Sequence, residues 1–315
     1  MLNVPLIVVV LLALLGLWAL SRFCYEPFTN AALALTRRLL GVQRRSIVVD
    51  GLRIVYLEIG CGEPLLLLHG LGADKDNFLI TAWMLRRRFR VIVPDLPGFG
   101  ESDKPPDASY RVPVQIERLR AFARALGITR FHVGGNSMGG LIAGAYAVTH
   151  PQDTLSLWLL APAGVKAAKP SVLMAAIANR AQQLPIFARD VREMRQLIAF
   201  ATGKPLPMPY CVLATMAAQQ QRNATLHRRI VDEMVEGPWL DELMASRPAT
   251  PTLIVWGDQD RALDVSGAAV LHALLPNSTL IILPGVGHIP MIEVPHRAGR
   301  AYLAFHAALA HARPP

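Results

Sequence analysis

Six short apolar runs, each closed by glycine, proline or aspartate, constrain the fold of this chain more than any other feature. They are "PLLLLHG", "RVIVPDLPGFG", "RFHVGGNS", "LSLWLLAPAG", "TLIVWGDQD" and "TLIILPGVGH". The apolar residues are continuous rather than alternating, which indicates strands buried on both faces, as in a parallel sheet covered by helices. Helical stretches separate the runs, and this alternation predicts an α/β domain.

Two segments depart from this alternation. The stretch "SIVVDGLRIVYLEIG" consists of two β-rich runs around Asp50 and Gly51, which is a strong hairpin signal. From about residue 165 to 247 no strand signal is present, and helical stretches rich in Ala, Met and Leu are interrupted by prolines. A separate helical domain is one interpretation of this segment. The return to a strand at "TLIVWG" favours a helical insertion that covers one edge of the sheet.

The first twenty residues, "MLNVPLIVVVLLALLGLWAL", carry one polar side chain, that of Asn3. A helix of this length spans about 30 Å, the thickness of a bilayer core. A cleaved signal peptide is the alternative, but no Lys or Arg precedes the run and no small-residue cleavage site follows it. Trp18, Phe23 and Tyr25 cluster at one end, as in an interfacial aromatic belt. We expect residues 1–27 to form a retained transmembrane anchor.

Residues 28–45 are expected to form a juxtamembrane helix, which Thr29 or Asn30 would cap and Gly41 would end. Its apolar and arginine positions suit a helix lying at the membrane interface, while a linker helix packed on the domain is the alternative. Arginines after the span favour a cytoplasmic catalytic domain, although a single span with a short tail leaves the side open. Homodimerisation through these two helices is also left open.

The net charge of +9 does not indicate nucleic-acid binding, because the chain has no block of five or more like charges, no zinc-ligand spacing and no RNA-binding aromatic motif. A positive balance beside an apolar anchor fits an anionic membrane surface better. The chain has three cysteines, too few for a dense disulfide framework.

One serine lies in a Gly-rich turn between a predicted strand and the helical stretch "GGLIAGAYAVTH". Gly135, Ser137 and Gly139 form the pattern G-x-S-x-G. A nucleophile at such a turn adopts a strained backbone conformation in which flanking side chains would collide, so glycine is needed on both sides. The pattern alone is weak, but in the strand–turn–helix context it indicates a nucleophilic Ser137.

A serine nucleophile needs a base and a group that orients this base. Both follow Ser137 in the order acid, then histidine. His288 in "LPGVGHIPMIEVP" is the best candidate for the base. Asp260 is the preferred acid because it lies just beyond a strand; Asp264 is the alternative, and Asp258 is expected to form the turn.

The negative charge that develops on the substrate oxygen needs hydrogen-bond donors already in place. The N–H of Met138, directly after the nucleophile, is one candidate, and the N–H of Leu71 in "LHGLG" is the other. Gly70 and Gly72 would permit close approach of the backbone. His69 is more compatible with holding this loop than with acid–base work.

These motifs resemble those of the α/β-hydrolases over residues 46–312: "LLLLHGLG", "VPDLPGFGES", "GGNSMGG", "LAPAG", "WGDQD" and "GVGHIPMIEVP" occur in that family's order. The match is closer still to membrane-anchored lipases of the monoacylglycerol-lipase type and to bacterial inner-membrane phospholipases A. The resemblance implies a mostly parallel eight-stranded sheet in a catalytic domain over 46–315, with the insertion at 165–247 as a lid.

The resemblance also implies roles for five residues. Ser137, Asp260 and His288 would form the catalytic triad, and Leu71 and Met138 the oxyanion hole. The implied location is a bacterial inner membrane, and neither a metal nor an organic cofactor is implied.

The expected function is hydrolysis of lipid carboxylic esters through an acyl-enzyme, of the phospholipase A, lysophospholipase or monoacylglycerol lipase type. Membrane phospholipid or acylglycerol would be the substrate and fatty acid the product. A carboxylesterase or thioesterase for soluble substrates and a non-catalytic ligand receptor are alternatives. A dehalogenase or epoxide hydrolase would carry Asp at position 137. The lid sets substrate choice, so headgroup and acyl-chain preference stay open.

Overall fold

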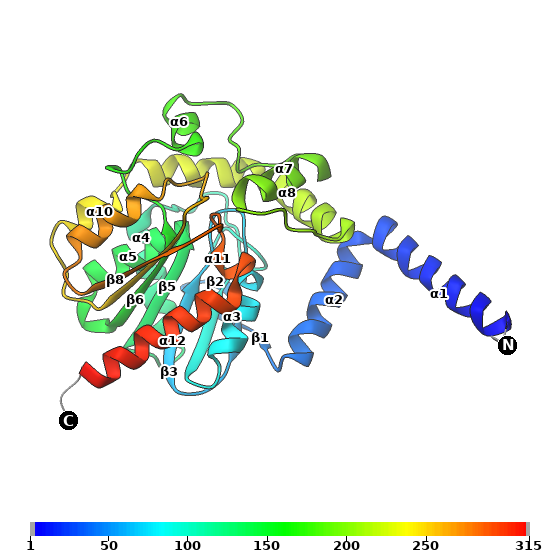
Figure 1. Cartoon of the computed structure of the whole chain (residues 1–315), viewed down its shortest axis with the longest axis horizontal. Coiled ribbons are helices and arrows are strands. Elements are labelled where there is room, and N and C mark those ends of the chain that lie inside the picture. The colour runs from blue at the N-terminus through cyan, green and yellow to red at the C-terminus, as the bar shows by residue number, and fades with distance from the viewer. Residues whose placement is uncertain (1–3, 313–315) are drawn as a thin grey trace.

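A computed structural model of the chain describes the backbone of residues 4–312 and the side chains of residues 14–310 (Figure 1). Its centre is an eight-stranded sheet with the strand order β1-β2-β4-β3-β5-β6-β7-β8. Strands β1 and β2 form an antiparallel hairpin, and β2 also pairs antiparallel with β4. All other neighbouring strands are parallel. The strands are β1 Gln43–Val49, β2 Leu52–Ile59, β3 Glu63–Leu68, β4 Phe89–Pro94, β5 Phe131–Ser137, β6 Thr154–Pro162, β7 Thr252–Gly257 and β8 Ser278–Leu283.

The central strands are buried on both faces, which confirms the interpretation of the continuous apolar runs. In β3, Leu66 and Leu68 join one core cluster, while Leu65 and Leu67 join another on the opposite face. Successive side chains of a strand point to opposite faces, so a strand between two helical layers must be apolar throughout.

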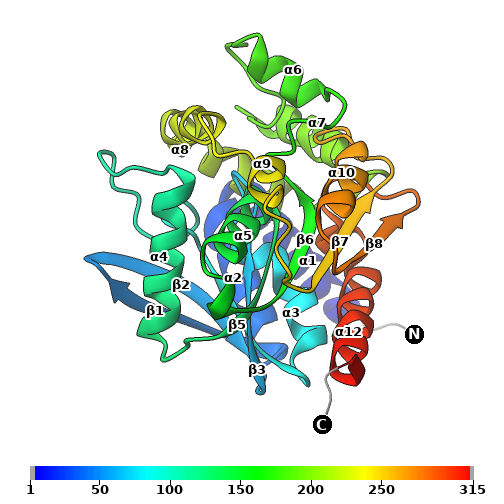
Figure 2. The same ribbon diagram turned by 90° about the vertical axis from the view of Figure 1, so that its left-hand side faces the viewer.

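Helices cover both faces of the sheet (Figures 1 and 2). Helices α4, α5 and α10 pack into one core cluster through Ile116, Leu141 and Leu271, and α3 and α12 pack into the other through Leu85 and Tyr302. The bounds are α3 Leu79–Leu85, α4 Val112–Ala125, α5 Met138–Thr149, α10 Ser266–Leu274, α11 Pro290–Glu293 and α12 Pro295–Ala312.

The predicted hairpin is confirmed. Asp50 and Gly51 connect β1 to β2 with φ values of 50° and 77°. Left-handed backbone at both central residues matches the twist of the flanking strands, and aspartate and glycine tolerate it best.

The helical insertion between β6 and β7 is also confirmed. It contains α6 Val172–Ala178, α7 Val191–Ala201, α8 Tyr210–Val235 and α9 Leu240–Met244, with no strand among its residues, all of which are described. A small apolar cluster of its own includes Met194, Ile198 and Leu213. Figure 1 shows α6, α7 and α8 lying over one end of the sheet.

Two helices precede the sheet: α1 Val4–Phe23, which extends away from the rest of the chain in Figure 1, and α2 Tyr25–Leu39. Helix α2 packs against α8, where Arg222 donates to Glu26 at 2.6 Å. In the part of the chain that the structure describes, no helix is both long and apolar enough to cross a membrane. Much of the predicted anchor at residues 1–27 lies outside the described side chains, and the anchor stays a prediction.

The predicted bounds of the juxtamembrane helix, residues 28–45, differ from those observed. Helix α2 begins at Tyr25, after non-helical backbone at Cys24, so the predicted cap at Thr29 or Asn30 is wrong. The Thr29 side chain is instead buried within the helix. Residues 43–45 belong to β1 because they pair with residues 56–58 of β2.

Candidate active site

Ser137 lies at the turn between β5 and α5 with strained backbone dihedrals, φ 56° and ψ −118°. A Cβ atom added to Gly135 would lie 2.3 Å from the backbone of Gly139, and one added to Gly139 would lie 2.2 Å from the carbonyl oxygen of Leu68. Neither position accepts a side chain, which gives the G-x-S-x-G pattern its physical reason. Left-handed backbone at a serine is uncommon and concentrates at functional sites.

His288 and Asp260 are hydrogen-bonded, with 2.8 Å between His288 Nδ1 and Asp260 Oδ2. The Asp260 side chain is buried, and its Oδ1 accepts hydrogen bonds from the backbone N–H groups of Ala262 and Leu263, both at 2.9 Å. The indole N–H of Trp256 donates to Oδ2, the oxygen that also contacts His288, at 3.1 Å. Four donors, counting His288, hold this carboxylate in one orientation.

The two alternative acids have other partners. Asp264 accepts from the backbone N–H of Ser266 at the start of α10, and hydrogen bonds from Ser266 hold the pKa of Asp264 below its ordinary value. Asp258 accepts from the N–H of Gly285 at 2.7 Å and joins two loops. The structure therefore brings Asp260, and not these neighbours, to His288.

Asn136 connects the turn of the nucleophile to the loop of His288. Its side-chain amide donates to the carbonyl oxygen of His288 at 2.9 Å and to that of Leu160 at 3.0 Å. Sequence reasoning did not single out Asn136, which fills a variable position of the motif. A buried amide directly before the nucleophile was the available signal.

The lid is tied to the same histidine loop. The N–H of His288 donates to the carbonyl oxygen of Ala201 at the end of α7, at 2.7 Å. Glu293 accepts from Gly287 at 2.9 Å and from Gly203 at 2.8 Å, so one carboxylate joins the histidine loop to the lid. Glu293 was also missed, although its loop was recognised.

The "HGLG" loop lies beside the nucleophile. A Cβ atom added to Gly70 would be 3.3 Å from the Cβ of Ser137. Met138 is the first residue of α5, so its N–H belongs to the positive end of a helix. The structure thus places Gly70, the residue before Leu71, beside Ser137, and the role of Leu71 and Met138 as oxyanion donors stays a prediction.

His69 holds this loop, in agreement with its interpretation from sequence. It is fully buried; its Nδ1 lies 2.8 Å from the carbonyl oxygen of Gly70, and its Nε2 accepts from the N–H of Leu96 at 3.0 Å. Burial lowers the pKa of His69, despite the opposing effect of Asp95. A neutral imidazole can serve both partners at once, and neither nitrogen is left for proton transfer.

A buried ion pair supports the other side of the loop. Lys75 Nζ lies 2.9 Å from Asp95 Oδ2 and 2.8 Å from Glu101 Oε1, and the lysine is 1% exposed. Burial alone would lower the pKa of Lys75, but Asp95 and the carboxylates near it raise it. The pair was not predicted, because nothing in the sequence links Lys75 to a strand end twenty residues later.

Known proteins with similar sequences and structures identify the family of the chain. Residues 63–295 match the model of the α/β hydrolase fold family. Lipase 1 of Psychrobacter immobilis is 36% identical over 268 residues, 83% of each chain. Monoacylglycerol lipase ABHD6 of Bos taurus is 27% identical over 87% of this chain and 85% of that protein. The crystal structure of a membrane phospholipase A, described as a bacterial virulence factor, is 36% identical and superposes with a TM-score of 0.87 over 98% of this chain and 99% of that one.

Proposed function

The chain belongs to the α/β-hydrolase fold family, and we propose that it is a membrane-anchored enzyme that hydrolyses the carboxylic ester bonds of lipids. A lipase- or phospholipase-type hydrolase is the activity named for its relatives at 33–36% identity. The observation that carries the proposal is the 2.8 Å hydrogen bond between buried Asp260 and His288, in a loop that Asn136 joins to Ser137.

The proposed mechanism proceeds through an acyl-enzyme. Ser137 attacks the ester carbonyl while His288 takes its proton through Nε2 and then delivers that proton to the leaving alcohol. Asp260 accepts from Nδ1–H, which keeps the correct tautomer and stabilises the imidazolium. Water activated by His288 then releases the fatty acid and restores Ser137.

Backbone donors stabilise the tetrahedral intermediate in this mechanism. The backbone N–H groups of Leu71 and Met138 would donate hydrogen bonds to the developing oxyanion and would take no part in proton transfer. Loss of one such donor typically reduces kcat by about 10²–10³-fold. His69, Lys75 and Asp95 act indirectly, since they fix the loop that carries Leu71.

The lid supports an apolar acyl chain as substrate. An apolar cluster joins Leu173 of α6 and Val231 of α8 to Ala262 in the loop of the triad acid, and Leu71 packs against it. Apolar residues thus extend from the predicted oxyanion hole into the lid. Burial of each CH₂ of an acyl chain contributes about 0.8 kcal/mol, so long chains favour such a surface. A carboxylesterase for soluble substrates would not need it.

A membrane location completes the proposal. The predicted anchor at residues 1–27 would hold the enzyme at a bacterial inner membrane, where phospholipid or acylglycerol is the substrate. Large apolar side chains are exposed at the junction, with 73% of Phe23, 57% of Leu35 and 77% of Leu39 accessible. Apolar surface of this kind, next to arginines, suits the boundary between headgroups and acyl chains.

The proposal is tested by mass-spectrometric lipid profiling of membranes incubated with the wild type, Ser137→Ala and Ser246→Ala. The wild type and the exposed-serine control should both release fatty acid from a defined lipid class, and Ser137→Ala should release none. If no lipid changes while a soluble ester is cleaved, the enzyme is a soluble-ester hydrolase. If neither the lipids nor the soluble ester is cleaved and a fluorophosphonate does not label Ser137, the protein is a non-catalytic ligand receptor and the proposal fails.

A further inference from the structure

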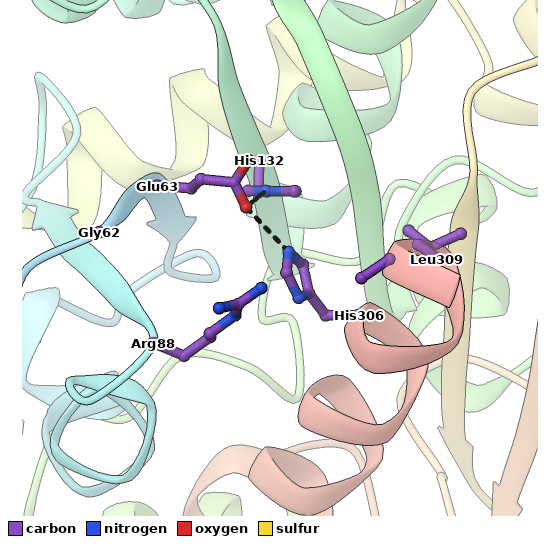
Figure 3. Close-up of a pocket in the computed structure, with 7 residues that line it drawn as sticks. Gly62, Glu63, Arg88, His132, His306 and Leu309 are labelled. Atoms are coloured by element: carbon purple, nitrogen blue, oxygen red, sulfur yellow. Dashed lines mark hydrogen bonds and ion pairs between the residues drawn. The ribbon is translucent and has the colours of Figure 1, made fainter. Parts of the chain in front are cut away.

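A second cluster of reactive side chains lies at the opposite end of the sheet from Ser137. Glu63 is the first residue of β3, His132 is the second residue of β5, and His306 lies on α12 (Figure 3). Parallel strands begin at the same edge of a sheet, so Glu63 and His132 come together there, while β5 carries Ser137 at its far end. The cluster is therefore separate from the candidate active site.

The three side chains converge on one carboxylate oxygen. Glu63 Oε2 lies 3.1 Å from His306 Nε2 and 3.5 Å from His132 Nε2. The three atoms that could act as ligands all lie within 4.8 Å of one another. Tetrahedral zinc with bonds of about 2.0–2.1 Å places its ligand atoms about 3.3 Å apart, so the observed separations bracket what zinc needs.

We propose that Glu63, His132 and His306 bind a divalent transition-metal ion, with Zn²⁺ as the best fit. Two imidazoles and one carboxylate are a frequent zinc ligand set, and imidazole ligands select transition metals over Mg²⁺ and Ca²⁺. The ion would join the start of β3, the start of β5 and α12.

Neighbouring groups already orient His132 as a metal ligand requires. Its Nδ1 lies 2.8 Å from Ser156 Oγ, which in turn lies 3.3 Å from the hydroxyl of Tyr302. A serine hydroxyl can accept from Nδ1–H, and in this orientation of the ring Nε2 lies 3.5 Å from Glu63 Oε2. Metal-binding histidines usually donate their other N–H in this way. His306 is held by edge-on packing against Phe89, with ring centroids 4.7 Å apart.

A cavity of about 330 Å³ borders the cluster and has room for a fourth ligand. Arg88 also lines this cavity (Figure 3). Its positive charge favours an anionic fourth ligand such as hydroxide or chloride.

The expected role is stabilisation, because the proposed hydrolysis needs no metal. A ligand that binds only the folded state raises the free energy of unfolding, and at concentrations above Kd the increase grows with the logarithm of the ratio of ligand concentration to Kd.

The test uses full-length protein without a histidine tag, stripped of metal with a chelator and titrated with Zn²⁺ against a chromophoric competitor. The wild type should bind one equivalent, and its thermal midpoint should rise with zinc. Glu63→Gln and His306→Gln should each weaken binding at least about tenfold and abolish the thermal shift. His296→Gln, on an exposed part of the same helix, should bind as the wild type does.

Fluorophosphonate labelling at Ser137 serves as the folding check for each variant, since it depends on a site at the other end of the sheet. If one variant fails to fold, the other still decides the question. Binding that survives both substitutions, binding that His296→Gln weakens equally, or no stoichiometric binding to the wild type would each overturn the proposal. Replacement of Zn²⁺ by Co²⁺ should give the intense visible bands of a tetrahedral site, and weak octahedral bands would contradict the geometry.

Discussion

Single residues decide which carboxylate orients the base. Asp260 has four donors and contacts His288, whereas Asp264 accepts from Ser266. Asp260→Asn should reduce kcat/KM for a p-nitrophenyl ester by about 10⁴-fold, because the amide favours the wrong imidazole tautomer. Asp264→Asn should stay within a few-fold of the wild type. The reverse order of the two variants would show that the acid is assigned to the wrong residue.

Asn136 is expected to act as a positioning residue. Asn136→Ala removes two buried hydrogen bonds, to the carbonyl oxygens of Leu160 and His288, and we expect a loss of about 1–3 kcal/mol in the free energy of unfolding. Because the loop of His288 would shift relative to Ser137, kcat should fall while KM for a short ester changes little. Asn277→Ala, which removes a similar amide-to-carbonyl bond at an exposed site, is the control. An unchanged kcat would limit Asn136 to a structural role.

The ion pairs of Glu101 predict a dependence of stability on pH. Burial raises the pKa of Glu101, but hydrogen bonds from Arg44 and Lys75 outweigh burial and lower it to about 2. A carboxyl group whose pKa is lower in the folded state than in the unfolded state stabilises the fold at pH values above its unfolded pKa, which is about 4.3. This stabilisation is lost as the pH falls toward the pKa of the folded state. The stability difference between the wild type and Glu101→Gln should be constant from pH 7 to pH 5 and shrink between about pH 4.3 and 2.

Urea unfolding at several pH values measures this difference, with the exposed Asp107→Asn as the control. A difference that grows as the pH falls would contradict the assigned ion pairs.

At the scale of elements, the contact between the lid and the histidine loop is the feature to perturb. Glu293→Gln places an amide N–H against one of the two backbone donors, Gly203 or Gly287, that the carboxylate now serves. We expect faster limited proteolysis within the lid and a lower kcat, because both elements lose a shared partner. Glu242→Gln, at an exposed ion pair with Lys166, should change neither. Unchanged proteolysis of Glu293→Gln would show that other contacts close the lid.

The strands and the insertion were predictable because local sequence determines them. The run "PLLLLHG" must be buried on both faces wherever it lies, and Asp50 with Gly51 favours one turn type. The start of α2 was not predictable, because it depends on packing against α8, almost two hundred residues later. In the candidate site, the motifs led to the proposed triad, whereas Asn136, Glu293 and the pair of Lys75 and Asp95 became visible only through contacts between distant segments.

The whole molecule joins a predicted anchor to a hydrolase through α2, which lies against the lid helix α8. We expect the anchor to deliver lipid to the site as well as to hold the enzyme at the membrane. An acyl chain that crosses open water loses about 0.8 kcal/mol of apolar contact per CH₂, and short esters have no such barrier. Deletion of residues 1–24, which spares α2, should preserve hydrolysis of a short p-nitrophenyl ester and sharply reduce hydrolysis of long-chain lipid in vesicles.

The informative quantity is the ratio of the two rates in the full-length and the shortened protein, both checked by circular dichroism. An equal ratio would mean that the anchor is only a tether, and that the lid recognises lipid without help from the bilayer.

We expect Ser137 to carry the acyl group of a lipid ester during turnover. The most direct measurement is acid quenching of the enzyme during hydrolysis of a long-chain lipid, followed by mass spectrometry of the peptide that contains "FHVGGNSMGG". The wild type should carry an acyl adduct on Ser137, whereas Ser137→Ala should carry none and should retain less than about 1% of the turnover. An adduct on another residue, or substantial turnover by Ser137→Ala, would show that Ser137 is not the nucleophile.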